Sequence, residues 1–170
     1  MSLRVIILLL MVCIMPATVQ GANQLTIGAS IVSLLLIDVK TSYLPWSLDA
    51  DLSPYTQMLD KNGGITVKAN KAGWTLYVRS EVSTLTDWDG STYSSKALHL
   101  PLTLESYPEG NAIGKRIKVS NSNQELVTNG EKGGEKKVGL GFTQPVSYED
   151  ESLNTGHTYH TILTFTAAAA

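Results

Sequence analysis

Residues 64–80 read GITVKANKAGWTLYVRS, and this stretch decides the fold class. Residues 65–69 and residues 74–79 each alternate apolar and polar side chains. A period of two is typical of a β-strand with one buried face, because successive side chains of a strand point to opposite faces. Residues 70–73 contain the asparagine and the glycine that favour a turn. The stretch therefore predicts two strands separated by a turn, and the buried face of the second consists of Trp74, Leu76 and Val78.

The same alternation recurs along the rest of the chain, whereas no run has the 3.6-residue period of a helix. Short strands separated by turn-forming residues predict an all-β fold, an antiparallel β-sandwich of the Ig-like or jelly-roll-like kind with about eight or nine strands. Residues 130–137, GEKGGEKK, form the most polar stretch, and we expect an exposed hairpin loop there. The alternating runs are Leu98–Leu104, Arg116–Val119, Val138–Phe142 and Tyr159–Phe165. The expected core consists of Trp74, Leu76, Val78, Leu100, Leu102, Leu140, Leu163 and Phe165.

The N-terminus has the order of a secretory signal peptide. Arg4 precedes an apolar run, which a proline and several small residues follow up to Gly21. The apolar run is too short for a permanent membrane helix, which needs about 20 apolar residues. We therefore expect residues 1–21 to be removed, residues 22–170 to form a single β-sandwich domain, and the protein to be secreted to the cell surface or cell wall. Cys13 is the only cysteine, so the alternative to simple cleavage is lipid attachment at that residue.

Charge and cysteine content exclude several classes of protein. Removing Arg4 from 13 basic residues leaves 12 against 15 acidic residues, a net charge near −3, which is not the basic footprint of a nucleic-acid-binding protein. The mature chain has no cysteine and hence neither a disulfide nor a thiol nucleophile. No Gly-x-Ser-x-Gly elbow and no phosphate-binding glycine-rich loop occurs in the sequence. We expect no cofactor and no enzymatic activity.

The first mature strand differs from the others because it is apolar on both faces. One interpretation is a central strand buried on both faces, or a strand that closes the sandwich. The other is an assembly strand that pairs with a second molecule, since the segment is uncharged, prone to β-structure and free of proline. Asp38 and Lys40 end the apolar run too early for a membrane span. The residues of this candidate assembly strand are Ile31, Val32, Leu34, Leu35, Leu36 and Ile37.

Few side chains suggest a ligand site. Asp87 and Asp89, in an Asp-x-Asp-Gly turn, are a weak candidate for calcium, because carboxylate oxygens at alternate positions suit this ion. Trp88 and Tyr93 are candidates for contact with a glycan or a partner protein. His157 and His160 are three residues apart, a spacing that puts them on opposite faces of a strand, so a zinc site is not expected.

Three stretches resemble the WxL-type surface domains of bacteria, which are secreted β-rich modules associated with the cell wall. These stretches are Gly64–Asn70, Gly73–Val78 and Gly156–Thr166. Trp74-Thr75-Leu76 matches the first Trp-x-Leu signature of that family, and Phe165-Thr166-Ala167 stands at the second. More loosely, the chain resembles self-assembling β-sandwich subunits of bacterial and archaeal surface fibres. The resemblance implies a cell-surface role.

Three functions follow from these features. The first is a structural protein that assembles with itself, through strand pairing between subunits, into a filament, sheath or surface layer. The second is a monomeric module that binds cell-wall polysaccharide or another surface protein. The third, a secreted hydrolase, would require two carboxylates across a cleft.

Overall fold

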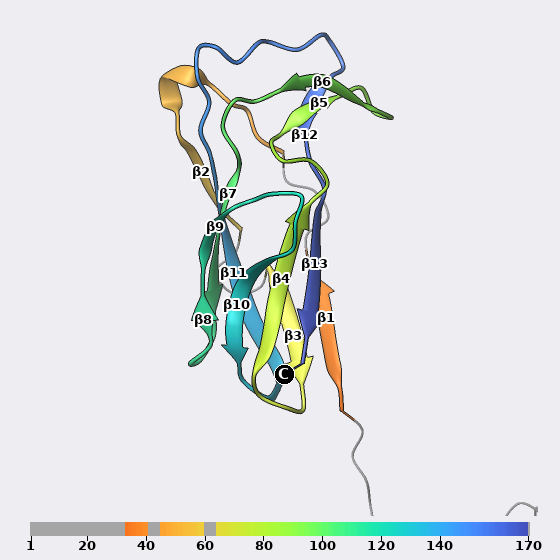
Figure 1. Cartoon of the computed structure of the whole chain (residues 1–170). Coiled ribbons are helices and arrows are strands. Elements are labelled where there is room, and N and C mark those ends of the chain that lie inside the picture. The colour runs from red at the N-terminus through yellow and green to blue at the C-terminus, as the bar shows by residue number, and fades with distance from the viewer. Residues whose placement is uncertain (1–32, 41–44, 60–63, 170) are drawn as a thin grey trace, which may run out of the picture. The chain divides into compact units, whose positions relative to one another are not determined.

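The computed structural model describes residues 33–40, 45–59 and 64–169, all of which belong to the compact unit 32–170. The predicted signal peptide, Ile31 and Val32 lie outside the described residues. The described part consists of strands and one short 3-10 helix, so the predicted all-β sandwich is confirmed (Figure 1). None of its helices is long and apolar enough to cross a membrane.

The first sheet has six strands, with the order β1-β3-β11-β7-β9 and with β2 also paired to β11. The long strand β11 pairs through residues 133–138 with β3 and through residues 140–144 with β2, so these two strands share one of its edges. All pairs in this sheet are antiparallel. The strands are β1 (Leu35–Val39), β2 (Tyr55–Leu59), β3 (Ile65–Ala69), β7 (Thr103–Pro108), β9 (Arg116–Lys118) and β11 (Gly133–Gln144).

The second sheet faces the first and has the order β13-β4-β10-β8. A smaller third sheet, of order β12-β5-β6, lies at one end of the sandwich, the upper end in Figure 1. The described residues contain thirteen strands rather than eight or nine, because the third sheet and the split between β8 and β9 add short strands. The remaining elements are β4 (Trp74–Ser80), β5 (Thr86–Trp88), β6 (Tyr93–Ala97), β8 (Ile113–Gly114), β10 (Gln124–Gly130), β12 (Thr158–His160), β13 (Leu163–Ala168) and η1 (Ala50–Leu52).

The core lies between the two large sheets. Trp74, Leu76 and Val78 are buried, as the alternation of residues 74–79 predicted. Leu102 and Leu140 are also buried, whereas Leu163 and Phe165 are only partly buried against this core. Further buried residues come from both sheets: Ile65, Val67, Leu104, Leu126, Val127 and Val138.

The prediction for Leu100 was wrong, because this side chain is 44% exposed. The predicted strand Leu98–Leu104 begins only at Thr103, where β7 starts. Pro101 lacks the N–H that a central strand uses for pairing, which interrupts the ladder ahead of β7. The residues before Thr103 instead cross the end of the sandwich, so the alternation of leucines there does not reflect a strand.

The polar stretch 130–137 is mostly strand rather than loop. β10 ends at Gly130 and β11 begins at Gly133, so the turn between them is only Glu131 and Lys132. A Cβ atom on Gly130 would lie 2.0 Å from the ring of buried Trp74, so this close approach requires glycine. The indole Nε1 of Trp74 donates to the backbone oxygen of Glu131 at 2.8 Å and thereby ties the core to the turn.

One side of the sandwich is closed by the chain itself. At Lys115, between β8 and β9, the backbone N donates to the oxygen of Leu126 in the second sheet, at 3.0 Å. The oxygen of Lys115 accepts from the backbone N of Ser106 in the first sheet, at 3.1 Å. Gly114 permits this crossing, because a Cβ atom there would lie 2.3 Å from the oxygen of Ser106. The two sheets are therefore joined on this side. On the opposite, open side, β1 and β13 are the edge strands of the two sheets in the described part of the chain.

Candidate functional site

Strand β1 lies at the edge of the first sheet on its open side. β3 is the strand that pairs with β1 in the described part of the chain. Leu35 and Ile37 pack against the core, whereas Leu34 and Leu36 on the other face are 48% and 52% exposed. A central strand buried on both faces is therefore wrong, because the pairing partners of the first sheet leave β1 outermost. The structure shows an edge strand with an apolar outer face.

Among the described residues, the register of β1 on β3 leaves three residues of β1 with unpaired backbone groups. The backbone N of Asn70 donates to the oxygen of Leu34 at 3.2 Å, and that of Lys40 donates to the oxygen of Gly64 at 3.1 Å. In an antiparallel pair, such bonded positions alternate with positions that point the other way. The even-numbered residues of β1 therefore bond to β3. The N–H and C=O groups of Leu35, Ile37 and Val39 point to the open edge.

Strand β13 forms the corresponding edge of the second sheet and lies beside β1 in Figure 1. It pairs with β4, and the backbone N of Glu81 donates to the oxygen of Ile162 at 3.0 Å just before β13 begins. By the same alternation, Leu163 and Phe165 direct their backbone groups away from β4. No backbone hydrogen bond joins β1 to β13 among the described residues. The open side thus presents two strand edges next to one another.

A cavity of about 770 Å³ lies at the end of the sandwich that carries the third sheet. Val39 at the end of β1 and Leu163 at the start of β13 line it, so it adjoins both open edges. Core residues Leu140 and Phe142 line it from β11, and its lining is mainly apolar. This volume falls within the range of about 300–1,000 Å³ typical of ligand sites.

Trp46 lines the cavity and carries a buried donor without an acceptor. Its ring packs edge-on against Phe142, with centroids 6.1 Å apart. Its Nε1 atom is buried and has no hydrogen-bond partner among the described residues. An unpaired buried donor costs about 1–3 kcal/mol, so an acceptor supplied by an occupant of the cavity would be stabilising. From the sequence, Trp46 was one of several aromatic residues that could stack on a sugar. Its place in a cavity could not be predicted, because no alternating run surrounds it.

Three rings gather on the third sheet. Trp88 is the last residue of β5 rather than part of the turn, and its ring lies 5.3 Å from that of His160 in a stacked arrangement. The ring of Tyr93 lies 4.7 Å from that of Trp88. The hydroxyl of Tyr93 donates to Glu81 at 3.1 Å and lies 2.9 Å from Nδ1 of His160. Burial and the bond to Glu81 raise the pKa of Tyr93 to about 12.

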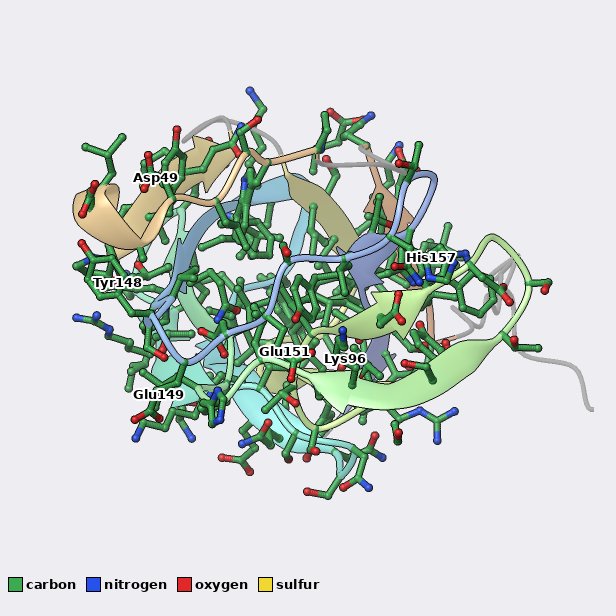
Figure 2. All side chains as sticks on the ribbon, turned by 90° about the horizontal axis from the view of Figure 1, so that it is seen from above. Asp49, Lys96, Tyr148, Glu149, Glu151 and His157 are labelled. Atoms are coloured by element: carbon green, nitrogen blue, oxygen red, sulfur yellow. The ribbon has the colours of Figure 1, made fainter. Side chains whose placement is uncertain are left out.

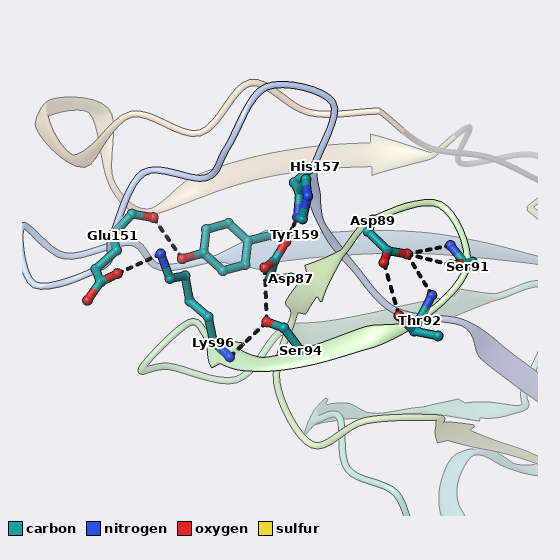
Figure 3. Close-up of polar contacts among 9 residues, drawn as sticks. All are labelled: Asp87, Asp89, Ser91, Thr92, Ser94, Lys96, Glu151, His157 and Tyr159. Carbon is teal, nitrogen blue, oxygen red and sulfur yellow. Dashed lines mark hydrogen bonds and ion pairs between the residues drawn. The ribbon is translucent and has the colours of Figure 1, made fainter.

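Asp87 and Asp89 have separate partners. Asp87 is buried and bonded to Nδ1 of His157 at 2.8 Å and to the hydroxyl of Ser94 at 2.9 Å (Figure 3). Burial raises the pKa of Asp87, but these bonds outweigh burial, so the pKa is lowered overall. Asp89 accepts from the backbone and hydroxyl groups of the next turn, at Ser91 and Thr92, which hold its pKa well below the usual range.

Within the described residues, both carboxylates of the calcium candidate bind other protein groups. The carboxylate of Asp87 binds a histidine and a serine, and that of Asp89 closes a turn, so the structure does not direct the two toward a common point. His157 and His160 likewise have different partners, as their predicted opposite faces imply. Within the described ranges, no group of three or more His, Cys, Asp or Glu side chains could hold a metal ion.

The loop before β12 covers the cavity and is held by polar contacts. Asp150 accepts from the backbone N of His99 at 2.9 Å and from that of Ser147 at 2.8 Å. Its burial raises the pKa of this carboxyl, but these bonds outweigh burial and lower it overall. Glu151 pairs with Lys96 of β6 at 2.6 Å. Seen from above, Lys96 and Glu151 lie between Tyr148 on one side of this end and His157 on the other (Figure 2).

Two of the three stretches that carry the resemblance to WxL-type domains, Gly73–Val78 and Gly156–Thr166, contribute strands that pair with each other. Phe165 of β13 stands opposite Val78 of β4, and Ala167 stands opposite Leu76. No family model, no curated protein and no solved structure matches the chain.

Proposed function

We propose that this protein is a non-enzymatic, extracellular structural subunit that assembles with itself into a filament, sheath or surface layer. The contact between subunits is β-strand pairing at the open side of the sandwich. The observation that carries the proposal is the open edge of β1, where the backbone groups of Leu35, Ile37 and Val39 have no partner within the described residues. An N-terminal sequence typical of secretion supports the extracellular role.

The side chains of β1 favour pairing of its open edge with a second chain and do little to prevent it. Soluble proteins usually guard an edge strand with charge, proline or a bulge along its length. In β1 the charge is confined to one end, where Asp38 forms an ion pair with Lys40 at 2.9 Å. The exposed Leu34 and Leu36 stand at the other end. A second chain that adds to this edge gains backbone hydrogen bonds and covers these leucines.

The test compares two leucine-to-lysine variants of the mature protein. Leu36→Lys places a charge on the exposed face of β1, and Leu52→Lys places the same charge on η1, where the leucine is 64% exposed. Leu36 is a sharper probe than Leu35, because Leu35 packs against the core. Light scattering and negative-stain electron microscopy should show assemblies of the wild type and of Leu52→Lys, but monomers of Leu36→Lys. Monomeric wild-type protein at all salt and protein concentrations would refute the proposal.

A second candidate function is favoured by the ring cluster of the third sheet. Trp88 and Tyr93 form part of this cluster, and aromatic rings with nearby hydrogen-bonding groups suit contact with a glycan or a surface protein. In this case the protein acts as a monomeric module that binds cell-wall polysaccharide. Wall polysaccharide should retain the wild type and a Tyr107→Ala control on β7, but not Trp88→Ala. Equal retention of both variants would exclude the cluster as the binding site.

A further inference from the structure

We propose that the cavity at the open side receives residues 22–33 of a second copy of this chain, so that subunits join head to tail. This inference rests on the proposed self-assembly and names the two surfaces that meet. The receiving surface is the cavity of about 770 Å³ that adjoins the upper ends of β1 and β13. The inserting segment is the stretch of mature chain that precedes β1.

The point where the inserting segment joins β1 and the receiving cavity lie at opposite ends of the sandwich, so the contact between subunits is head to tail. The chain enters β1 at the end of the sandwich opposite to the third sheet, whereas the cavity lies at the end that carries this sheet (Figure 1). Twelve residues, 22–33, span at most about 43 Å when extended. A segment that leaves one end of a subunit can therefore reach the cavity at the other end of the next. Such a heterologous contact joins different surfaces of two subunits, and it extends into a filament when the rotation between them does not close a ring.

The chemistry of the segment suits the cavity. Residues 22–33 read ANQLTIGASIVS and contain no charged side chain. Leu25, Ile27, Ala29 and Ile31 stand at alternate positions, so an extended segment presents them on one face. That face fits the apolar lining, and the absence of charge avoids repulsion by Asp150 and Glu151, which also line the cavity.

The cavity also has the polar groups that an inserted strand requires. Leu163 and Phe165 line it and direct their backbone groups to the open edge of β13, where an extended chain can add as a further strand. Trp46 contributes a buried Nε1 donor that lacks an acceptor, and a backbone carbonyl of the inserted segment supplies one. An occupant with both apolar side chains and free backbone groups satisfies the whole lining.

The test is disulfide cross-linking between two single-cysteine variants. All proteins are the mature chain, residues 22–170, which contains no native cysteine. Ile27→Cys is mixed with a tagged Ile162→Cys variant, whose cysteine stands at the cavity in a residue that is 50% exposed. The matched control is a tagged Ile113→Cys variant on β8, on the closed side, where the isoleucine is 56% exposed. After mild oxidation, the tag identifies the mixed dimer by its size, and circular dichroism checks that each variant folds.

The expected result is a mixed dimer with Ile162→Cys and none with Ile113→Cys, in samples that contain assemblies by electron microscopy. Assemblies without this cross-link, or with equal cross-linking to both variants, would overturn the inference and leave the proposed function standing. A double Ile27→Cys/Ile162→Cys variant that links only within one chain would overturn it as well. Absence of both assemblies and cross-links would refute the inference and the proposed function together.

Discussion

Proline substitution at neighbouring residues of β1 separates assembly from folding. The N–H of Val39 points to the open edge, whereas that of Asp38, which stands opposite Thr66, lies on the side bonded to β3. Proline removes the N–H and is tolerated in an edge strand where this group faces outward. Val39→Pro should therefore fold normally and fail to assemble, and Asp38→Pro should lose stability.

The expected losses of stability and of assembly each follow from one backbone hydrogen bond, which Asp38→Pro removes toward β3 and Val39→Pro removes toward a second subunit. Asp38→Pro breaks a ladder bond and leaves an acceptor on β3 unpaired, which costs about 2 kcal/mol. With a slope of about 2 kcal/mol per molar urea, the unfolding midpoint falls by about 1 M. Val39→Pro should stay within about 1 kcal/mol of the wild type, because Val39 is half-exposed and its N–H has no partner in the isolated chain. At a contact between subunits, the same loss of about 2 kcal/mol raises the critical concentration for assembly roughly thirtyfold.

Urea unfolding followed by fluorescence measures the first effect, and light scattering over a concentration series measures the second. Normal assembly of Val39→Pro would show that the edge of β1 is not used between subunits. Equal destabilisation by the two prolines would show that the register deduced for β1 is incorrect, since only one of the two N–H groups should bond to β3.

Three further predictions concern stability. Gly130→Ala should lower the free energy of unfolding by about 3 kcal/mol, because its Cβ would meet the buried ring of Trp74 at 2.0 Å. Gly134→Ala, which has open space around it, is the control and should be neutral. Equal midpoints of urea unfolding for the two variants would contradict this reasoning. Because the pKa of Asp150 is lowered in the fold, its ionised carboxylate stabilises the protein above about pH 4, and this stabilisation is lost as the pH falls. The difference in thermal midpoint between the wild type and Asp150→Asn should therefore decrease from pH 6 to pH 3. A constant difference would assign another role to this carboxylate. Tyr93→Phe keeps the ring contacts but removes the hydrogen bonds of the hydroxyl. It should lower the free energy of unfolding by about 1 kcal/mol. An unchanged free energy of unfolding would show that these hydrogen bonds contribute nothing to stability.

Local alternation predicted the strands that have one buried face. In β4, residues 74–80 follow the predicted pattern, and Trp74, Leu76 and Val78 are all in the core. The period of two is a property of each strand by itself, so sequence is sufficient to find it. Alternation failed at Leu100, where a neighbouring proline prevents pairing, because the apolar pattern does not record whether the backbone can join a sheet.

The partners of each strand were not visible in the sequence. The strands of residues 65–69 and 74–80 are neighbours in the chain, yet β3 belongs to the first sheet and β4 to the second. Turn residues such as those at 70–73 indicate that the chain reverses, but a turn within a sheet and a crossing between sheets use similar residues. The position of β1 at an edge follows from this pairing and could not be derived from its composition.

The candidate site was likewise predicted in part from the sequence and decided in part by the tertiary structure. Sequence alone singled out the apolar strand near Ile31–Ile37 and the aromatic residues Trp88 and Tyr93. Only the tertiary structure decided that β1 and β13 form adjacent open edges, and that Trp46 lines a cavity beside them. The sequence by itself determined the all-β class and the buried face of β4, because these depend on contacts along one strand. Sheet order, open edges and cavities arise from contacts between segments far apart in the chain, and only the assembled fold specifies those.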